Sequence, residues 1–165
     1  MTQVKNNYLE DSIFANIKKL LFSFDIPWYF YENATDKSDD ENARDFFYCH
    51  MLYDDDQIKS NFFNAIALPI LGKLTFSKII RIKINMYTAN PQIIIQKPNY
   101  HVDFKYPHRV ALLNVNSNNG YTEFENGEKI VSEANQLLEF DGQNKHRAIS
   151  QTDTDVRINI NINYL

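Results

Sequence analysis

Residues 157–164 read Arg-Ile-Asn-Ile-Asn-Ile-Asn-Tyr, a strict alternation of polar and apolar side chains. Successive side chains of a β-strand point to opposite faces, so this period of two predicts a strand with one isoleucine face and one polar face. In an ordinary sandwich the isoleucine face points into the core. A site inside a barrel inverts that rule, because the polar face then lines the interior and the isoleucines pack under helices. The sequence is compatible with both arrangements.

The same kind of sequence extends back to about residue 76. Short segments of β-branched and aromatic residues are separated by turn residues, and Asn126-Gly127 and Asp141-Gly142 are both typical of hairpin turns. The polar face of the segment 80–85, with Arg81, Lys83 and Asn85, poses the same question of orientation. The expected strands cover 80–85, 93–96, 109–115, 120–124, 135–140, 146–150 and 157–164.

The first part of the chain has a different pattern. Apolar residues recur at helical spacing over 9–24, and a second helix is expected after Ser60, with Gly72 as its end. The aromatic segment 26–30 is expected to be extended, with Trp28, Tyr29 and Phe30 in the core. Residues 45–53 are ambiguous between helix and strand, and their aromatic content favours a strand.

These elements predict one domain over residues 1–165, mostly β with supporting N-terminal helices. Residues 1–75 form the support, and residues 76–165 form a jelly roll or helix-supported β-barrel that carries any site. A length of 165 residues is enough to bury a core, and 44% hydrophobic content argues against disorder.

Composition also limits the partners and the compartment. The formal net charge is −4 and the basic residues are scattered, so there is no strong nucleic-acid footprint. No apolar run reaches the length of a membrane span. The first residues lack the apolar stretch of a signal peptide, and Cys49 is the single cysteine. We therefore expect a cytoplasmic protein that makes no membrane contact.

A candidate metal site begins at His101-Val102-Asp103. On a strand, residues two apart share a face, so this histidine and aspartate are expected to bind one ion together, with His146 as a third ligand from a neighbouring strand. Two imidazoles and one carboxylate are the ligands of non-haem Fe(II) oxygenases, and three protein ligands leave coordination positions open. The motif alone is a weak signal, so its context decides the interpretation.

That context resembles the 2-oxoglutarate and Fe(II)-dependent oxygenases, in particular the prolyl-4-hydroxylase-like branch and its small phage-type members. Five features match the family in order: the H-x-D motif, the strand G-x-T-x-F, the strand that ends in a phenylalanine before the distal histidine, that histidine, and a co-substrate arginine. They are His101-Val102-Asp103, Gly120-Tyr121-Thr122-Glu123-Phe124, Asn135-Gln136-Leu137-Leu138-Glu139-Phe140, His146 and Arg157.

The resemblance implies a double-stranded β-helix, a cupin-like jelly roll, with His101, Asp103 and His146 as ligands of Fe(II). It also implies that 2-oxoglutarate is the co-substrate and that its far carboxylate is bound by Arg157. Hydroxylation of a C–H bond by dioxygen, with release of succinate and CO2, would follow, and ascorbate is a candidate further cofactor. Tyr87 and Thr122 are expected to lie beside the co-substrate.

The resemblance leaves the substrate open. Its branch points to a prolyl or other peptidyl side chain, whereas small phage members also suggest a nucleobase or a small molecule, and a phage origin would place the protein in the host cytoplasm. Loops usually select the substrate, and the segments 31–45 and 97–109 are the expected rim. His50 and His108 are expected to be structural rather than ligands.

Two alternatives remain open at this point. One is a non-catalytic cupin-like barrel that binds a metal and a small ligand without turnover. The other is a structural or interaction module in which the histidines and the aspartate are incidental. The chain also departs from the family pattern: no tyrosine occurs in the segment 110–114, where relatives often place one, and Asn119 precedes Gly120 where a glycine pair is usual.

Overall fold

The computed structural model describes residues 2–32, 46–89 and 99–165, which form an antiparallel β structure with two helices. The helices are α1 (Asp11–Leu21) and α2 (Phe63–Leu71). The strands are β1 (Gln3–Lys5), β2 (Tyr29–Tyr31), β3 (Phe47–Asp54), β4 (Gln57–Ile58), β5 (Ile79–Thr88), β6 (Arg109–Asn114), β7 (Tyr121–Phe124), β8 (Lys129–Val131), β9 (Gln136–Asp141), β10 (His146–Ile149) and β11 (Val156–Tyr164).

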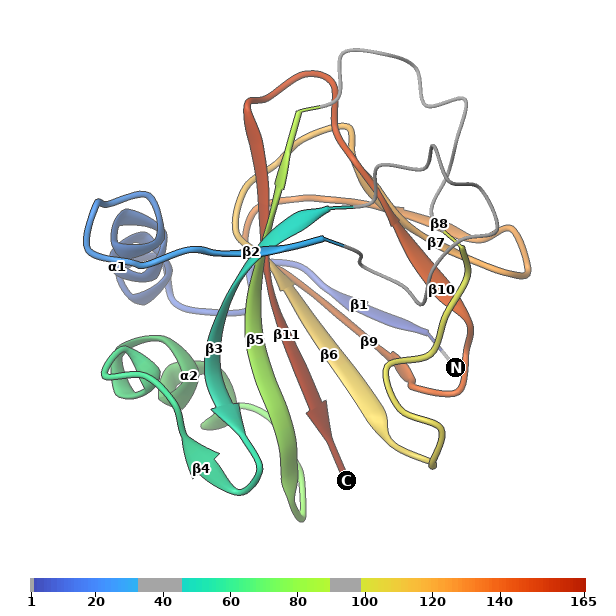
Figure 1. Ribbon diagram of the computed structural model, residues 1–165, viewed down its shortest axis with the longest axis horizontal. Helices are drawn as coiled ribbons and strands as arrows, with labels where there is room; N and C mark the ends of the chain where they lie inside the picture. Colours follow the sequence, from blue (N-terminus) through green and yellow to red (C-terminus); the bar gives the residue numbers. More distant parts are fainter. Residues whose placement is uncertain (1, 33–45, 90–98) are drawn as a thin grey trace.

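These strands form two sheets. The large sheet has the order β1-β9-β6-β11-β5-β3-β2, with β4 attached to β3, and the small sheet has the order β10-β7-β8. Figure 1 shows both helices on one side of the large sheet and the small sheet on the other side. Strand β11 lies in the middle of the large sheet between β6 and β5, so its two faces look toward the helices and toward the small sheet. The chain is therefore layered, with helices, a large sheet and a small sheet.

The layers settle the orientation of the alternating strand. Ile158, Ile160 and Ile162 belong to the main apolar core, which also contains Ile17 of α1 and Ile66 of α2. The polar side chains of β11 face the small sheet instead. The mostly β class with supporting helices is confirmed, and the inverted arrangement of polar and apolar faces is the one that occurs.

A second, smaller apolar cluster fills part of the space between the sheets. It joins side chains of β6, β7 and β9, with Phe124 and Phe140 in edge-to-face contact at 5.0 Å between ring centroids. Such contacts tie the small sheet to the large one through aromatic packing. The polar groups of β5 and β11 occupy the rest of this inner face.

Local sequence explains the ends of several elements. Helix α1 buries Ile17 and Leu21 on one side. The basic residues in its last turn interact favourably with the negative end of the helix dipole. Helix α2 contains Pro69 and ends at Leu71, with Gly72 as the cap residue where the sequence predicted the end. The Asn126-Gly127 turn joins β7 to β8, with Gly127 at φ 88°, a backbone angle that glycine adopts without strain.

Other expectations were wrong. Asp141-Gly142 does not form a hairpin, because β9 pairs with β6 and β1 whereas β10 pairs with β7 in the other sheet. Trp28, Tyr29 and Phe30 were expected in the core, and Trp28 does pack against it. Tyr29 and Phe30 are instead 59% and 60% exposed on the short edge strand β2.

Two further expectations fall partly or wholly outside the described residues, namely the strand at 93–96 and most of the rim segment 31–45. Among the residues that are described, no helix is long and apolar enough to cross a membrane.

Candidate metal centre

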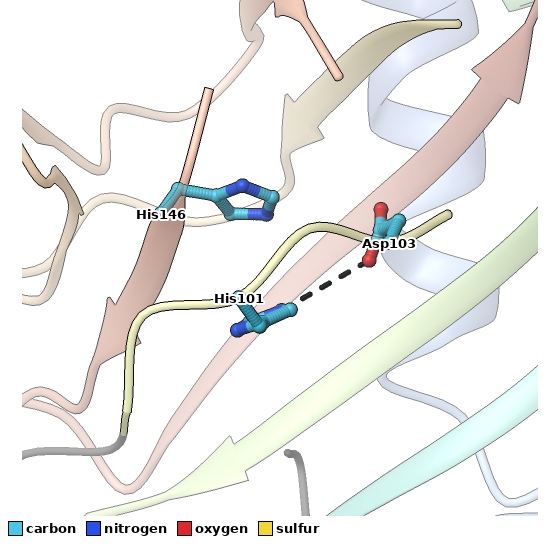
Figure 2. A group of neighbouring side chains, drawn as sticks. All are labelled: His101, Asp103 and His146. Atoms are coloured by element: carbon cyan, nitrogen blue, oxygen red, sulfur yellow. Dashed lines mark ion pairs between the residues drawn. The ribbon is translucent and has the colours of Figure 1, made fainter. Parts of the chain in front are cut away.

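His101, Asp103 and His146 come together between the two sheets, as Figure 2 shows. One ligand atom from each of the three side chains can be chosen so that all lie within 4.8 Å of one another. His146 is the first residue of β10, and His101 lies beside it in the segment before β6. Ligand atoms that share one ion lie this close together, so the geometry is suited to a single metal.

The main chain holds the two histidines in register. The amide of His101 donates to the carbonyl of His146 at 3.0 Å, and the amide of His146 donates back to the carbonyl of His101 at 3.0 Å. The ring centroids lie 4.8 Å apart. The expectation that His101 and Asp103 share a regular strand is wrong, since His101 forms an isolated bridge and Asp103 lies in a bend.

Asp103 is oriented by the last strand of the large sheet. Its Oδ2 accepts hydrogen bonds from the side-chain amides of Asn161 at 3.1 Å and Asn163 at 2.7 Å, and Arg81 lies 3.5 Å from Oδ1. Burial alone would raise the pKa of this carboxyl. The positive charge of Lys83 and the other neighbours outweigh burial, so the pKa of Asp103 lies well below its usual range. Asp103 is therefore ionised, the form that binds metal.

The two imidazoles are in the neutral form, which is the form that binds metal. Burial lowers the pKa of His101 and that of His146, so both rings are neutral near pH 7. Nδ1 of His146 lies 3.1 Å from the carbonyl oxygen of Asn144, and this contact assigns its proton to Nδ1 and leaves Nε2 as the free donor atom. Phe140 packs edge-to-face on the same ring at 4.9 Å. Two neutral imidazoles and one carboxylate fit Fe(II).

Arg157 lies on the same inner face of β11 and is completely buried. Its guanidinium donates to the carbonyl oxygens of Tyr121 and Ile149, at 3.2 and 3.1 Å, and to the hydroxyl of Ser132 at 2.8 Å. Burial lowers its pKa to about 10. Within residues 2–32, 46–89 and 99–165, no carboxylate forms an ion pair with it. A buried cation without a counter-ion is costly, so this position is suited to an anionic ligand.

The two other expected co-substrate residues both lie beside this arginine. The hydroxyl of Thr122 accepts a 3.3 Å hydrogen bond from Nη2 of Arg157, and the guanidinium carbon lies 5.6 Å from the centre of the Tyr87 ring. Tyr87 pairs directly with Arg157 across β5 and β11 and stacks on Phe47. The structure therefore places Arg157, Thr122 and Tyr87 together.

Gly120 explains how the large arginine side chain fits. A Cβ atom at Gly120 would lie 3.0 Å from Cδ of Arg157 and 2.8 Å from Oδ1 of Asn118. Glycine is needed here for space, which is consistent with its place in the motif that begins at residue 120.

Sequence reasoning missed several contacts of the site. It did not assign Ser132 to Arg157, nor did it assign Asn161, Asn163 and Arg81 to Asp103. The polar face of β11 was the available signal for the two asparagines. The hydroxyl of Ser132 had no signal at all.

The remaining histidines are separate from this centre. His50 contacts the Pro27 carbonyl oxygen and the Ser60 hydroxyl, at 2.8 and 2.7 Å. His108 packs against Gly142 and contacts the Tyr106 carbonyl at 2.9 Å. Both arrangements agree with the structural role expected for these histidines.

Comparisons with known proteins show similarity in structure but not in sequence. No family model matches the chain, and no curated protein matches it either. Solved structures do match across 99% of this chain. One is a 2OG-Fe(II) oxygenase family protein from Burkholderia pseudomallei, with a TM-score of 0.67, 10% identity and 84% of its own chain covered.

Two further matches are prolyl hydroxylases. The viral collagen prolyl hydroxylase of Paramecium bursaria Chlorella virus-1, in complex with 2OG, has a TM-score of 0.58 at 11% identity, with 96% of its chain covered. A prolyl hydroxylase from Trichoplax adhaerens, in complex with a hypoxia inducible factor peptide fragment, has a TM-score of 0.61 at 14% identity, with 83% covered. The resemblance inferred from the motifs is thus confirmed at the level of the fold, which this chain shares with the 2OG-Fe(II) oxygenases and the prolyl hydroxylases.

Proposed function

We propose that this protein is an Fe(II)- and 2-oxoglutarate-dependent dioxygenase that hydroxylates a C–H bond. In this proposal the two sheets form a double-stranded β-helix within one domain, and His101, Asp103 and His146 bind the iron. Arg157 binds the far carboxylate of 2-oxoglutarate, with Thr122 and Tyr87 beside it. Bound iron and 2-oxoglutarate supply the dioxygen chemistry that releases succinate and CO2.

One observation carries the proposal. A completely buried arginine without a carboxylate partner among the described residues lies on the same inner face as the His–Asp–His group. In a purely structural module, a buried cation without a counter-ion would destabilise the fold and bring no benefit. A dicarboxylate that reaches the metal at one end and the guanidinium at the other gives both groups a partner. The carboxylate would meet the positive charge of Arg157 and the one N–H, on Nη2, that its four hydrogen bonds to the described residues leave over.

The protein's own residues then have distinct tasks. The main-chain bridge of His101 and His146 fixes the separation of the two nitrogen ligands, and Asn161 and Asn163 aim the carboxylate of Asp103. Thr122 and Ser132 hold the guanidinium of Arg157 in place before the co-substrate arrives. Preorganisation of this kind lowers the cost of binding and orientation.

For the substrate, a prolyl or other peptidyl side chain is our first candidate. Support comes from the prolyl hydroxylases among the structural neighbours, one of them bound to a peptide fragment. A nucleobase or a small molecule is the alternative class. Candidate substrates are best compared by the succinate that each releases.

The direct test measures binding and turnover separately. Anaerobic calorimetry with Fe(II) and then with 2-oxoglutarate is expected to show that wild type binds both, and that Arg157→Met keeps the metal but binds 2-oxoglutarate about 100-fold more weakly. The matched control is Lys19→Met on the exposed side of α1. Succinate release should require Fe(II) and should be lost in Asp103→Ala.

The outcomes separate the alternatives. Metal and 2-oxoglutarate binding without succinate from any candidate substrate, even with ascorbate present, would favour a non-catalytic binding barrel. Absence of metal binding in wild type would favour a structural module.

A further inference from the structure

Lys83 is a second cationic side chain on the inner face of the large sheet. It lies on β5 directly opposite Asn161 of β11, and its Nζ atom is 5.5 Å from the centre of the Phe47 ring. In the described part of the chain, no hydrogen bond or ion pair involves this ammonium. An ammonium group carries three N–H donors and no acceptor, so a partly buried lysine in this state lacks the partners that such groups normally have.

Unpartnered acceptor atoms lie on the neighbouring positions. The side-chain oxygens of Asn85 and Asn161 are buried and have no hydrogen-bond partner. Asn85 follows Lys83 by two residues on the same face of β5 and is 2% exposed. Its side-chain amide donates a 3.0 Å hydrogen bond to Oδ1 of Asn159. The side-chain amide of Asn161 donates a hydrogen bond to Oδ2 of Asp103. Lys83, which forms no hydrogen bond in the described part of the chain, and two acceptor oxygens without hydrogen-bond partners therefore belong to neighbouring positions of two paired strands, which is the composition of a polar binding site.

The balance of charge on this face points to an anion. Among the described residues of this face, Arg81, Lys83 and Arg157 are cationic, and Asp103 is the acid that lies among them. A divalent metal would add two positive charges, and 2-oxoglutarate would bring two negative charges. Positive charge would still be in excess, and burial lowers the pKa of the Lys83 ammonium even though Asp103 opposes this effect. A further carboxylate interaction at Lys83 would offset the cost of that burial.

Lys83 and Arg157 serve different ends of the site. Tyr87 is the direct cross-strand partner of Arg157, and Lys83 precedes Tyr87 by four residues on the same strand. At about 3.3 Å per residue, the two cations are rooted roughly 13 Å apart along the sheet. The backbone of Lys83 lies at the end of the site where Asn161 contacts Asp103. The backbone of Arg157 lies at the other end, where its side chain contacts Thr122.

From this arrangement, and resting on the proposed function, we infer that Lys83 binds a carboxylate beside the metal ligands, as a second anion-binding residue distinct from Arg157. Two sources present this chemistry at that place. One is the carboxylate next to the 2-oxo group of the co-substrate, and the other is a carboxylate of the substrate. In the second case the oxygens of Asn85 and Asn161 accept from the substrate's N–H or O–H groups.

The experiment uses Mn(II)-loaded protein, because Mn(II) takes similar nitrogen and oxygen ligands. Calorimetry compares wild type, Lys83→Met, Arg157→Met and the surface control Lys19→Met. The probes are 2-oxoglutarate and 2-oxopentanoate, in which a methyl group replaces the far carboxylate. If Lys83 binds the co-substrate, Lys83→Met weakens both probes at least about tenfold, whereas Arg157→Met weakens 2-oxoglutarate much more than 2-oxopentanoate.

A second measurement detects the substrate source. Acetate is added to the Mn(II) protein saturated with N-oxalylglycine, and relaxation of the acetate methyl protons by the metal is recorded. If Lys83 binds a substrate carboxylate, wild type and Lys19→Met enhance this relaxation, and Lys83→Met loses the enhancement while it binds both 2-oxo acids normally.

The inference about Lys83 is overturned if Lys83→Met matches wild type in both measurements. That result leaves the proposed function intact, provided that wild type binds Mn(II) and 2-oxoglutarate and that Arg157→Met loses 2-oxoglutarate. Wild-type protein that binds neither would overturn the proposed function, and the role of Lys83 with it.

Discussion

Asn163 donates a 2.7 Å hydrogen bond to Oδ2 of Asp103, the same oxygen that accepts from Asn161 at 3.1 Å. Asn163 is completely buried in the central strand of the large sheet, so the carboxylate of Asp103 is fixed by a rigid element although Asp103 itself lies in a bend. Partners behind a metal ligand orient it and tune its affinity for the ion. In the proposed metal centre, the last strand would therefore orient a ligand without contributing one itself.

We predict that Asn163→Ala weakens Fe(II) or Mn(II) binding by roughly 10- to 100-fold, because Asp103 loses its shortest hydrogen bond. Anaerobic calorimetry measures the affinity. Asn16→Ala, on the exposed surface of α1, is the control and should bind metal as wild type does. Equal affinity in Asn163→Ala and Asn16→Ala would show that Asp103 needs no support from Asn163.

Gly120→Ala should weaken 2-oxoglutarate binding and spare the metal. The added Cβ would lie 3.0 Å from Cδ of Arg157 and 2.8 Å from Oδ1 of Asn118, so the arginine must shift from the position that its partners hold. The control is Gly72→Ala, whose Cβ would meet its nearest atom at an ordinary 3.4 Å. Calorimetry on Mn(II)-loaded protein tests this, and undiminished affinity in Gly120→Ala would mean that the shift of Arg157 is harmless.

The stability of the metal-free protein should decrease as the pH falls from 7.5 to 5.5. Burial lowers the pKa values of His101 and His146 below the unfolded value of about 6.5. The unfolded chain therefore binds more protons than the folded chain in this range, and the free energy of unfolding falls as protons are added. Urea unfolding in EDTA measures the effect. His146→Gln removes one of the two groups and should show a smaller decrease; an unchanged decrease would exclude His146 as its source.

Gly142→Ala should destabilise the fold by about 1–3 kcal/mol, because its Cβ would lie 2.2 Å from Nε2 of His108. Urea unfolding gives the change in the free energy of unfolding. The double variant with His108→Ala removes the atom that clashes and should recover part of the loss, which a double-mutant cycle reveals as coupling between the two positions. Additive effects of the two substitutions would contradict direct contact as the cause.

The alternating sequence of 157–164 predicted the strand and its two faces, but not which face looks inward. That choice depends on what covers each face, namely the helices on one side and the small sheet on the other. Local periodicity carries no information about layers that are assembled from distant parts of the chain. The charged and amide side chains of this strand were the available signal for a polar interior, because such residues are seldom fully buried unless they have partners.

The proximity of His101, Asp103 and His146 was predicted, although for a partly wrong reason. A shared strand was assumed, whereas a single bridge to His146 positions His101 and the asparagines of β11 position Asp103. Their role as metal ligands stays a prediction. The family motif specified which residues meet, and the hydrogen bonds that make them meet were not readable from spacing.

Two errors share a physical cause. The turn residues Asp141-Gly142 are compatible with a tight reversal, yet the chain crosses from one sheet to the other there. Tyr29 and Phe30 are typical strand residues, yet they lie on an edge strand where little covers them. In both cases local preference was correct and tertiary pairing decided the outcome.

The reciprocal main-chain bridge between His101 and His146 makes the two proposed nitrogen ligands part of one backbone ladder. Opening of the segment around His101 must break these two amide hydrogen bonds, and a bound ion must be released or strained at the same moment. Under the proposed function, hydrogen–deuterium exchange at those two amides would slow when the metal binds, because the ion and the ladder would resist opening together.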